Sequence, residues 1–335
     1  MTTSRARRRL IWIAVSALLL AVLGPALAPN TPTAQFADRA YAPPMRVHLF
    51  HQGSLRAPFV YRQVLVDRVS RQYADDTAVP VSLRWLRHGL ASVDEAQGPL
   101  LLLGADSLGR DMLSRVLHGA RWSLGVALTG LAGALALGIL VGALAGATGG
   151  RVEAVLMWCA DFVLALPGTY LVLVLRGMLP PVLTPWEILG FMSLLMAASA
   201  WPHVARGVRA IVATERQREY AEAARAAGAG RWRIAWTLLP AARGFLLVEV
   251  VLLLPALLVA EATISFLGLG FPDSSASWGT MLEAAYNPQL LAEAPWLLAP
   301  AAAIFLVTLA AQIAQPRASE PDPAAAPSGA SPAVA

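Results

Sequence analysis

Residues 122–147 read WSLGVALTGLAGALALGILVGALAGA, an apolar run without a single charged side chain. A bilayer core about 30 Å thick is crossed by a helix of about 20 mostly apolar residues, so this run is long enough to cross it. The run therefore indicates a membrane-spanning helix.

Five further apolar stretches of similar length occur along the chain, at 10–28, 154–175, 186–204, 245–268 and 296–314. The overall composition agrees, because 57% of the 335 residues are hydrophobic and only 14% are charged. We therefore predict an all-α membrane protein with six transmembrane helices.

The positions of the arginines predict the orientation. They gather before the first span, at Arg151 and between the fourth and fifth spans, whereas Arg176 alone follows the third span and 271–295 has no basic residue. Basic residues in short loops mark the cytoplasmic side. Both termini are thus expected inside, with the segment 29–121 outside.

The same map predicts the domain organisation. Residues 1–28 form the cytoplasmic N-terminus and first span, and 29–121 an external loop subdomain with short strands near 57–61 and 79–85. Apolar residues every four positions from 108 to 120 predict an amphipathic interfacial helix at its end. A five-helix core at 122–314 follows, with a cytoplasmic segment at 205–244, and the Ala-, Pro- and Ser-rich tail 315–335 is expected to be disordered.

Two features of the N-terminal part have competing interpretations. The first span also fits a signal peptide ending at Ala26–Ala28, although Pro29 directly after that site argues against cleavage. His48 and His51 resemble part of a metal site, but two histidines are too few to predict one. We expect no bound metal.

Composition excludes several functions. All 26 basic residues are arginine, so a phosphate-binding loop ending in Gly-Lys-Ser/Thr is absent and the chain has no ATPase site of its own. The lone Cys159 allows no intrachain disulfide. The net charge of +5 is explained by arginines on the cytoplasmic side, so we expect no nucleic-acid partner and no cofactor.

Three motifs stand out against this background. Residues 218–228 read REYAEAARAAG, followed by Leu239-Pro240; the alanines favour a helix with little bulk, and Gly228 suits the corner that ends it. Residues 103–115 read LGADSLGRDMLSR, and residues 261–270 read EATISFLGLG, followed by SWGTML at 277–282. Taken alone, the first motif also fits an ordinary Ala-rich surface helix.

The first motif resembles the Glu-Ala-Ala...Gly motif of ABC importer permeases, and the other two are similar to signatures of their dipeptide, oligopeptide and nickel branch. The resemblance implies a MetI-like core and a C-type permease. It also implies that a cytoplasmic helix turn docks on the ATPase through Tyr220, Glu222, Ala223, Ala224 and Gly228. The external motif comprises Gly104, Asp106, Gly109, Arg110 and Asp111.

The chain departs from the family pattern in several places, among them Trp236-Thr237, which stand where a basic residue is common, and an external loop longer than the branch minimum. Ala105 stands where threonine is usual, and the spacing from Gly228 to Pro240 is one residue shorter than usual. The family's closing Gly-Asp-x-Leu-Arg-Asp segment is absent after Ala311. These differences put the details of ATPase docking and the C-terminal contacts in question.

The resemblance also implies partners and a location. A permease of this type works in the bacterial inner membrane with two ATP-binding subunits, a second homologous permease and an external solute-binding protein. The expected cargo is di- or oligopeptides, with nickel or another small solute as the alternative. A stand-alone secondary transporter would be expected to show an internal repeat, which we do not find, and an intramembrane protease would need a histidine base inside a span.

Three carboxylates fall within predicted spans: Asp161, Glu249 and Glu261. Ionisable residues in a membrane are expensive and often line a solute path, but each of these also fits a structural contact between helices. In the second span, glycines recur every four residues at 138, 142 and 146, which predicts close approach of another helix. Pro167-Gly168 and Pro255 predict bends in the third and fifth spans.

Overall fold

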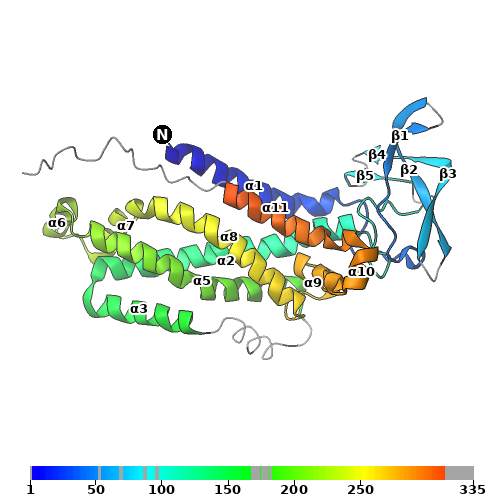
Figure 1. Cartoon of the computed structure of the whole chain (residues 1–335). Helices are drawn as coiled ribbons and strands as arrows, with labels where there is room; N and C mark the ends of the chain where they lie inside the picture. The colour runs from blue at the N-terminus through cyan, green and yellow to red at the C-terminus, as the bar shows by residue number, and fades with distance from the viewer. Residues whose placement is uncertain are drawn as a thin grey trace, which may run out of the picture.

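Figure 1 shows the computed structural model, in which long helices run side by side and the strands gather at one end. The structure describes residues 2–51, 54–67, 71–85, 89–94, 98–166, 174, 180 and 183–313. The short helix α6 (Glu219–Ala226) lies at the end opposite the strands. Pro167-Gly168, Arg176 and the tail 315–335, for which we made predictions, lie outside the described residues.

Four helical segments are long and apolar enough to cross a membrane among the described residues: Met112–Thr148, Pro185–Glu215, Arg231–Phe266 and Pro295–Ile313. They cover the predicted second, fourth, fifth and sixth spans. The first predicted span lies within α1 (Thr2–Leu27), of which Val15–Leu27 counts as a shorter apolar helix. The part of the chain that the structure describes is thus mostly helical, with four candidate spans.

Helix α2 (Met112–Thr148) is one continuous helix of 37 residues. The prediction of a separate interfacial helix before residue 121 is therefore wrong, because this stretch is continuous with α2. Met112, Val116 and Ala120 lie in the first turns of α2, and Leu108 lies in the turn before it. Asp111 begins α2, because its side chain accepts hydrogen bonds from the amides of Leu113 and Ser114. Apolar periodicity continues across this boundary, so it could not reveal where the helix begins.

The third predicted span, 154–175, is not one helix over its whole length. Helix α3 (Gly150–Ala165) ends at Leu166, which has the extended conformation φ −73°, ψ 125°. A proline disfavours the helical conformation of the residue before it, and Pro167 follows directly. The 16 residues of α3 span about 24 Å at 1.5 Å per residue, less than the bilayer core.

Helix α5 (Pro185–Glu215) packs along α2 with their backbones close together, as the glycine repeat predicts. A Cβ atom on Gly138 would lie 2.5 Å from Cβ of Val204, and one on Gly142 would lie 2.5 Å from the carbonyl oxygen of Ala205. A Cβ on Gly146 would lie 2.8 Å from the carbonyl oxygen of Arg209. A side chain at any of these three positions would therefore collide with α5, so glycine allows the two helices to approach closely there.

Two short helices and a 3-10 turn connect α5 to the next long helix. They are α6, α7 (Arg231–Leu238) and η3 (Leu239–Ala242), and α8 (Arg243–Phe266) follows directly. Residues 205–215, the first part of the predicted cytoplasmic segment 205–244, continue helix α5. The two short helices and the 3-10 turn follow within the same segment.

The segment 29–121 contains β-structure as well as loops. Strands β1 (Val47–His51), β2 (Ser54–Asp67) and β3 (Gln72–Ser82) form an antiparallel sheet in the order β1-β2-β3. Strands β4 (Arg84–Trp85) and β5 (Ala91–Ser92) form a second pair, and the 3-10 turn η1 (Ala37–Arg39) precedes the sheet. The strand pieces predicted near 57–61 and 79–85 lie in these strands. His48 and His51 pack against Phe59 and Tyr61.

Short helices connect α8 to the last long helix, α11 (Ala299–Ile313). In chain order they are η4 (Asp273–Ser275), α9 (Trp278–Leu282), η5 (Glu283–Tyr286), α10 (Pro288–Glu293) and η6 (Pro295–Leu298). Trp278 of α9 is fully buried, and its indole Nε1 donates a hydrogen bond to the carbonyl oxygen of Val116 at 2.9 Å. This bond connects α9 to α2. This end of the helices lies beside the sheet (Figure 1).

Candidate functional sites at the two ends of the helices

The residues expected to contact an ATPase form a compact helix turn at the α6 end. Helix α6 ends at Ala227, and Gly228 then adopts φ +82°, the left-handed conformation that glycine reaches without strain. Nothing lies within 4 Å of where a Cβ on Gly228 would be. Gly228 thus forms the corner that the sequence predicted, and the structure adds that this corner is exposed and its surroundings are open.

The face of α6 that points away from the protein is small and polar. Ala221 is buried, whereas Glu222 and Ala223 are exposed and Ala224 is half-buried. Tyr220 is half-exposed and donates its hydroxyl hydrogen to Glu215 Oε2 at 2.7 Å, which connects α6 to the end of α5. The exposed alanines leave room for another protein surface to approach closely.

At the opposite end, the predicted external motif forms a tight, charged turn before α2. Asp106 Oδ1 accepts hydrogen bonds from the backbone amides of Leu108 and Arg110, both at 2.9 Å. Its Oδ2 pairs with Arg110 Nε at 2.7 Å and lies 3.6 Å from Arg115 Nε. All three charged side chains are buried, so a single carboxylate lies between two guanidinium groups and leaves one positive charge for another partner to balance.

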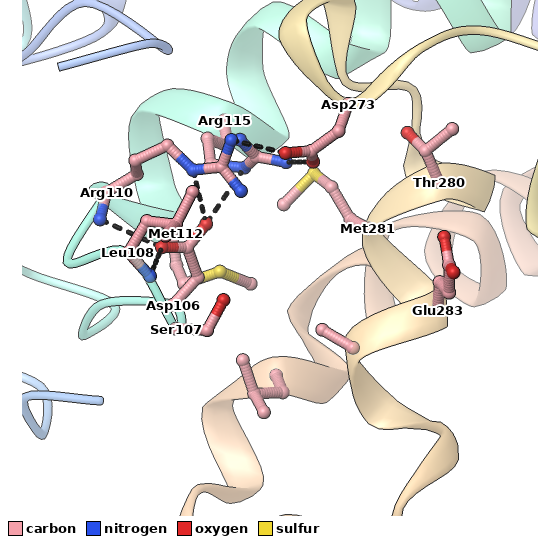
Figure 2. A pocket seen from close by; sticks show the side chains of 12 residues that line it. Asp106, Ser107, Leu108, Arg110, Met112, Arg115, Asp273, Thr280, Met281 and Glu283 are labelled. Atoms are coloured by element: carbon pink, nitrogen blue, oxygen red, sulfur yellow. Dashed lines mark hydrogen bonds and ion pairs between the residues drawn. The ribbon is translucent and has the colours of Figure 1, made fainter. Parts of the chain in front are cut away.

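Asp273, which the sequence did not single out, completes this cluster from a distant part of the chain. One of its oxygens accepts a hydrogen bond from Arg110 Nη1 at 2.6 Å, and the other from Arg115 Nη2 at 2.7 Å. All of these side chains line one cavity of about 360 Å³. Figure 2 shows Asp273 facing the two arginines, while Thr280, Met281 and Glu283 line another part of the cavity. Asp273 thereby links the start of α2 to the segment after α8.

Asp111 holds a second junction in the same motif. Besides capping α2, its Oδ2 accepts a hydrogen bond from Asn30 Nδ2 at 3.1 Å, and the Asn30 backbone amide donates to Ser114 Oγ at 2.9 Å. Because Asn30 follows α1, these bonds fix the exit of α1 against the entry of α2. The role of Asn30 could not be seen in the sequence, since 81 residues separate it from Asp111.

The two glycines of the motif are needed for backbone geometry. Gly104 and Gly109 have φ of +73° and +75°. A Cβ on Gly109 would lie 1.9 Å from the carbonyl oxygen of Phe36, and one on Gly104 would lie 2.8 Å from Cδ1 of Trp296. Both positions therefore combine left-handed backbone with close contact to other parts of the chain.

The charges in the motif shift one another's pKa values. Partial burial alone would raise the pKa of Asp273, but the hydrogen bonds and positive charges of Arg110 and Arg115 outweigh it and hold that pKa below its usual range. Burial opposes the charged form of Arg110, yet Asp273 and Asp106 raise its pKa. Burial raises the pKa of Asp111, opposed by hydrogen bonds from Ser114 and Asn30.

The three carboxylates predicted within spans occupy different environments. Glu261 of α8 is fully buried, and its Oε1 accepts a hydrogen bond from Ser265 Oγ at 2.7 Å. The hydroxyl groups of Ser123 on α2 and Ser277 before α9 lie near this carboxyl group, and Oε2 has no hydrogen-bond partner among the described residues. Glu261 therefore lies in the packing between three helices, away from any surface.

Asp161 and Glu249 lie nearer the surface. Asp161 of α3 forms an ion pair with Arg206 of α5. The side chain of Asp161 is 58% exposed and that of Arg206 is 50% exposed. Glu249 of α8 is half-buried. The structure does not bring Glu261 together with these two carboxylates.

A comparison with known proteins identifies the class. Residues 138–318 match the family described as binding-protein-dependent transport system inner membrane component. The chain belongs to this family and is an ABC-type permease subunit, a multi-pass membrane protein. Members of this family generally work together with ATPase subunits and a solute-binding protein.

Individual relatives agree over most of the chain. It is 36% identical over 243 residues to the di/tripeptide transport system permease protein DppC of Pseudomonas aeruginosa, covering 72% of this chain and 74% of that one. It is 30% identical over 225 residues to the oligopeptide transport system permease protein OppC of Lactococcus lactis subsp. cremoris, covering 66% and 75%. A putative peptide permease of Brucella ovis is 35% identical over 209 residues, covering 62% and 67%.

Proposed function

We propose that this chain is one of two permeases that together form the pore of an ATP-driven importer for di- or oligopeptides. The relatives named above support peptides as the cargo, since their names describe peptide transport. In this proposal six spans cross the inner membrane, both termini are cytoplasmic, and the segment 29–121 lies outside, where an external solute-binding protein delivers its cargo.

The observation that carries the coupling role is the exposed turn formed by α6, Gly228 and α7. It lies at the end of the helices opposite the sheet (Figure 1). Its outer face presents Glu222 and Ala223 to solvent. A rigid, small-residue helix joined directly through α7 and η3 to α8 is suited to pass movement of a bound ATPase to a membrane-spanning helix.

Co-purification tests this role with a matched pair of variants. Ala223→Arg places a long charged side chain on the exposed face of α6, and Ala292→Arg makes the same change on an exposed alanine of α10 at the other end. From membranes of cells that produce the whole importer, we expect Ala223→Arg to lose the two ATPase subunits and Ala292→Arg to retain them. Retention in both variants would refute docking through α6.

The cargo needs a separate measurement. We expect cells that depend on this importer to accumulate labelled di- and tripeptides, and this uptake to stop when Ala223→Arg replaces the wild-type chain. Uptake of nickel without uptake of peptides would instead support the alternative cargo on the same scaffold.

A further inference from the structure

Helix α7 has an exposed face that the coupling role does not explain. Trp232 and Trp236, four residues apart, are 50% and 53% exposed, and their rings meet edge to face with centroids 5.9 Å apart. Arg231 and Arg233 beside them are also exposed. The other face of α7 is buried against the helical core through Ile234, Ala235 and Leu238. The helix is thus anchored on one side and presents aromatic and cationic groups on the other.

The segment that contains α7 is longer than the hydrocarbon core of a bilayer. Helix α7, turn η3 and helix α8 form one apolar segment, Arg231–Phe266, of 36 residues. About 20 residues cross the hydrocarbon core, so one end of this segment must lie outside it. The arginines of α7 make that end the one that leaves the core. With only η3 between α7 and the start of α8, α7 falls at the depth of the lipid headgroups.

The charges of α7 fit an anionic lipid surface better than they fit α6's partner. No acidic residue occurs between Arg225 and Glu249, whereas Arg231, Arg233 and Arg243 do. Helix α6, by contrast, carries Glu219 and Glu222, the latter paired with Arg225 at 3.7 Å. Tryptophan rings favour the headgroup layer, and arginine binds phosphate oxygens.

We propose that the exposed face of α7 binds phospholipid headgroups of the cytoplasmic leaflet, with Trp232 and Trp236 in the headgroup layer and Arg231 and Arg233 on lipid phosphates. The two short helices then have separate partners, the ATPase for α6 and the membrane surface for α7. The inference rests on the orientation and coupling role proposed above.

Spin-label accessibility tests the depth of α7 in the full chain. Cys159, the single cysteine, is replaced by serine, and nitroxide labels are attached at Thr237→Cys on α7 or at Ala226→Cys on α6, both exposed positions. In nanodiscs that contain phosphatidylglycerol, we expect the label at 237 to collide more with oxygen and less with a water-soluble nickel chelate than the label at 226. Equal access of the nickel chelate to both labels would overturn the proposal.

Lipid preference provides the second test, again with a matched control. Each arginine near an anionic surface contributes roughly a fivefold preference for anionic over neutral lipid. We therefore expect the combined Arg231→Gln and Arg233→Gln variant to lose most of its preference for phosphatidylglycerol over phosphatidylcholine, and Arg225→Gln on α6 to keep it. An equal loss in both variants would refute a specific role of α7.

The same variants separate this inference from the proposed function. If the combined arginine variant released the ATPases and kept its lipid preference, α7 would be part of the ATPase surface and the lipid proposal would be wrong. If instead Ala223→Arg failed to release the ATPases, the coupling role would fall, while the lipid measurements on α7 would still stand or fail by themselves.

Discussion

At the scale of single residues, Asp273 shows how one exposed carboxylate can hold two buried arginines. Its side chain is 58% exposed, whereas those of Arg110 and Arg115 are 8% and 3% exposed. Removing its charge leaves two guanidinium groups dependent on Asp106 alone. A buried charge that loses a partner is costly, so the contact matters more than an exposed ion pair would.

We expect Asp273→Asn to lower the free energy of unfolding by about 1–3 kcal/mol at neutral pH, because a charged hydrogen-bond acceptor is lost. Since the pKa of Asp273 is lowered in the folded protein, its contribution is fully present above the unfolded value near pH 4 and is lost progressively as pH falls from there through the lowered folded pKa. Thermal unfolding in detergent at several pH values checks this. A difference between wild type and variant that stays constant down to pH 3 would contradict it.

Two glycines with similar backbone conformations should respond differently to the same change. Gly109→Ala puts a Cβ 1.9 Å from the Phe36 carbonyl oxygen, so the turn before α2 must shift and we expect little correctly folded protein. Gly228→Ala meets open space and adds only the left-handed strain of about 1–2 kcal/mol. The yield of monodisperse protein after detergent extraction compares them. Equal yields would show that the contact at Gly109 relaxes without cost.

At the scale of helices, the packing of α2 on α5 depends on a line of glycines. We expect Gly142→Ala to destabilise the protein by about 1–3 kcal/mol, because its Cβ would lie 2.5 Å from the Ala205 carbonyl oxygen. Gly190→Ala, on α5 with nothing within 4 Å, is the control and should be neutral or slightly stabilising because alanine favours the helix. Unfolding titrations of both variants distinguish close packing from a general effect of replacing glycine.

At the scale of the whole molecule, the sheet and α6 lie at opposite ends of the helices (Figure 1). If this axis crosses the membrane as proposed, the two ends face different compartments. In a Cys159→Ser background, we expect Leu55→Cys on β2 to react with a membrane-impermeant maleimide in intact spheroplasts. Ala226→Cys on α6 should react only after permeabilisation. The reverse pattern would invert the proposed orientation.

Local sequence was sufficient for the helical class, four of the spans and the corner at Gly228. These properties depend on apolar length and on backbone preferences that neighbouring residues set. The same local signals misplaced the beginning of α2 and the end of the third span. The apolar periodicity continues on both sides of Asp111, so it does not show that α2 begins there. The apolar stretch 154–175 likewise continues past the proline after Leu166, so its length does not show that α3 ends before that proline.

The sequence by itself determined that this chain is a membrane protein of the permease family with a charged motif before α2 and an Ala-rich turn after α5. Only the tertiary structure decided which partners those charges have. Asn30 and Asp273 reach the motif from 81 and 163 residues away, and Glu261 turns into the packing between helices instead of facing a surface. Such contacts follow from how the helices assemble, because distance along the chain carries no information about proximity once helices pack side by side.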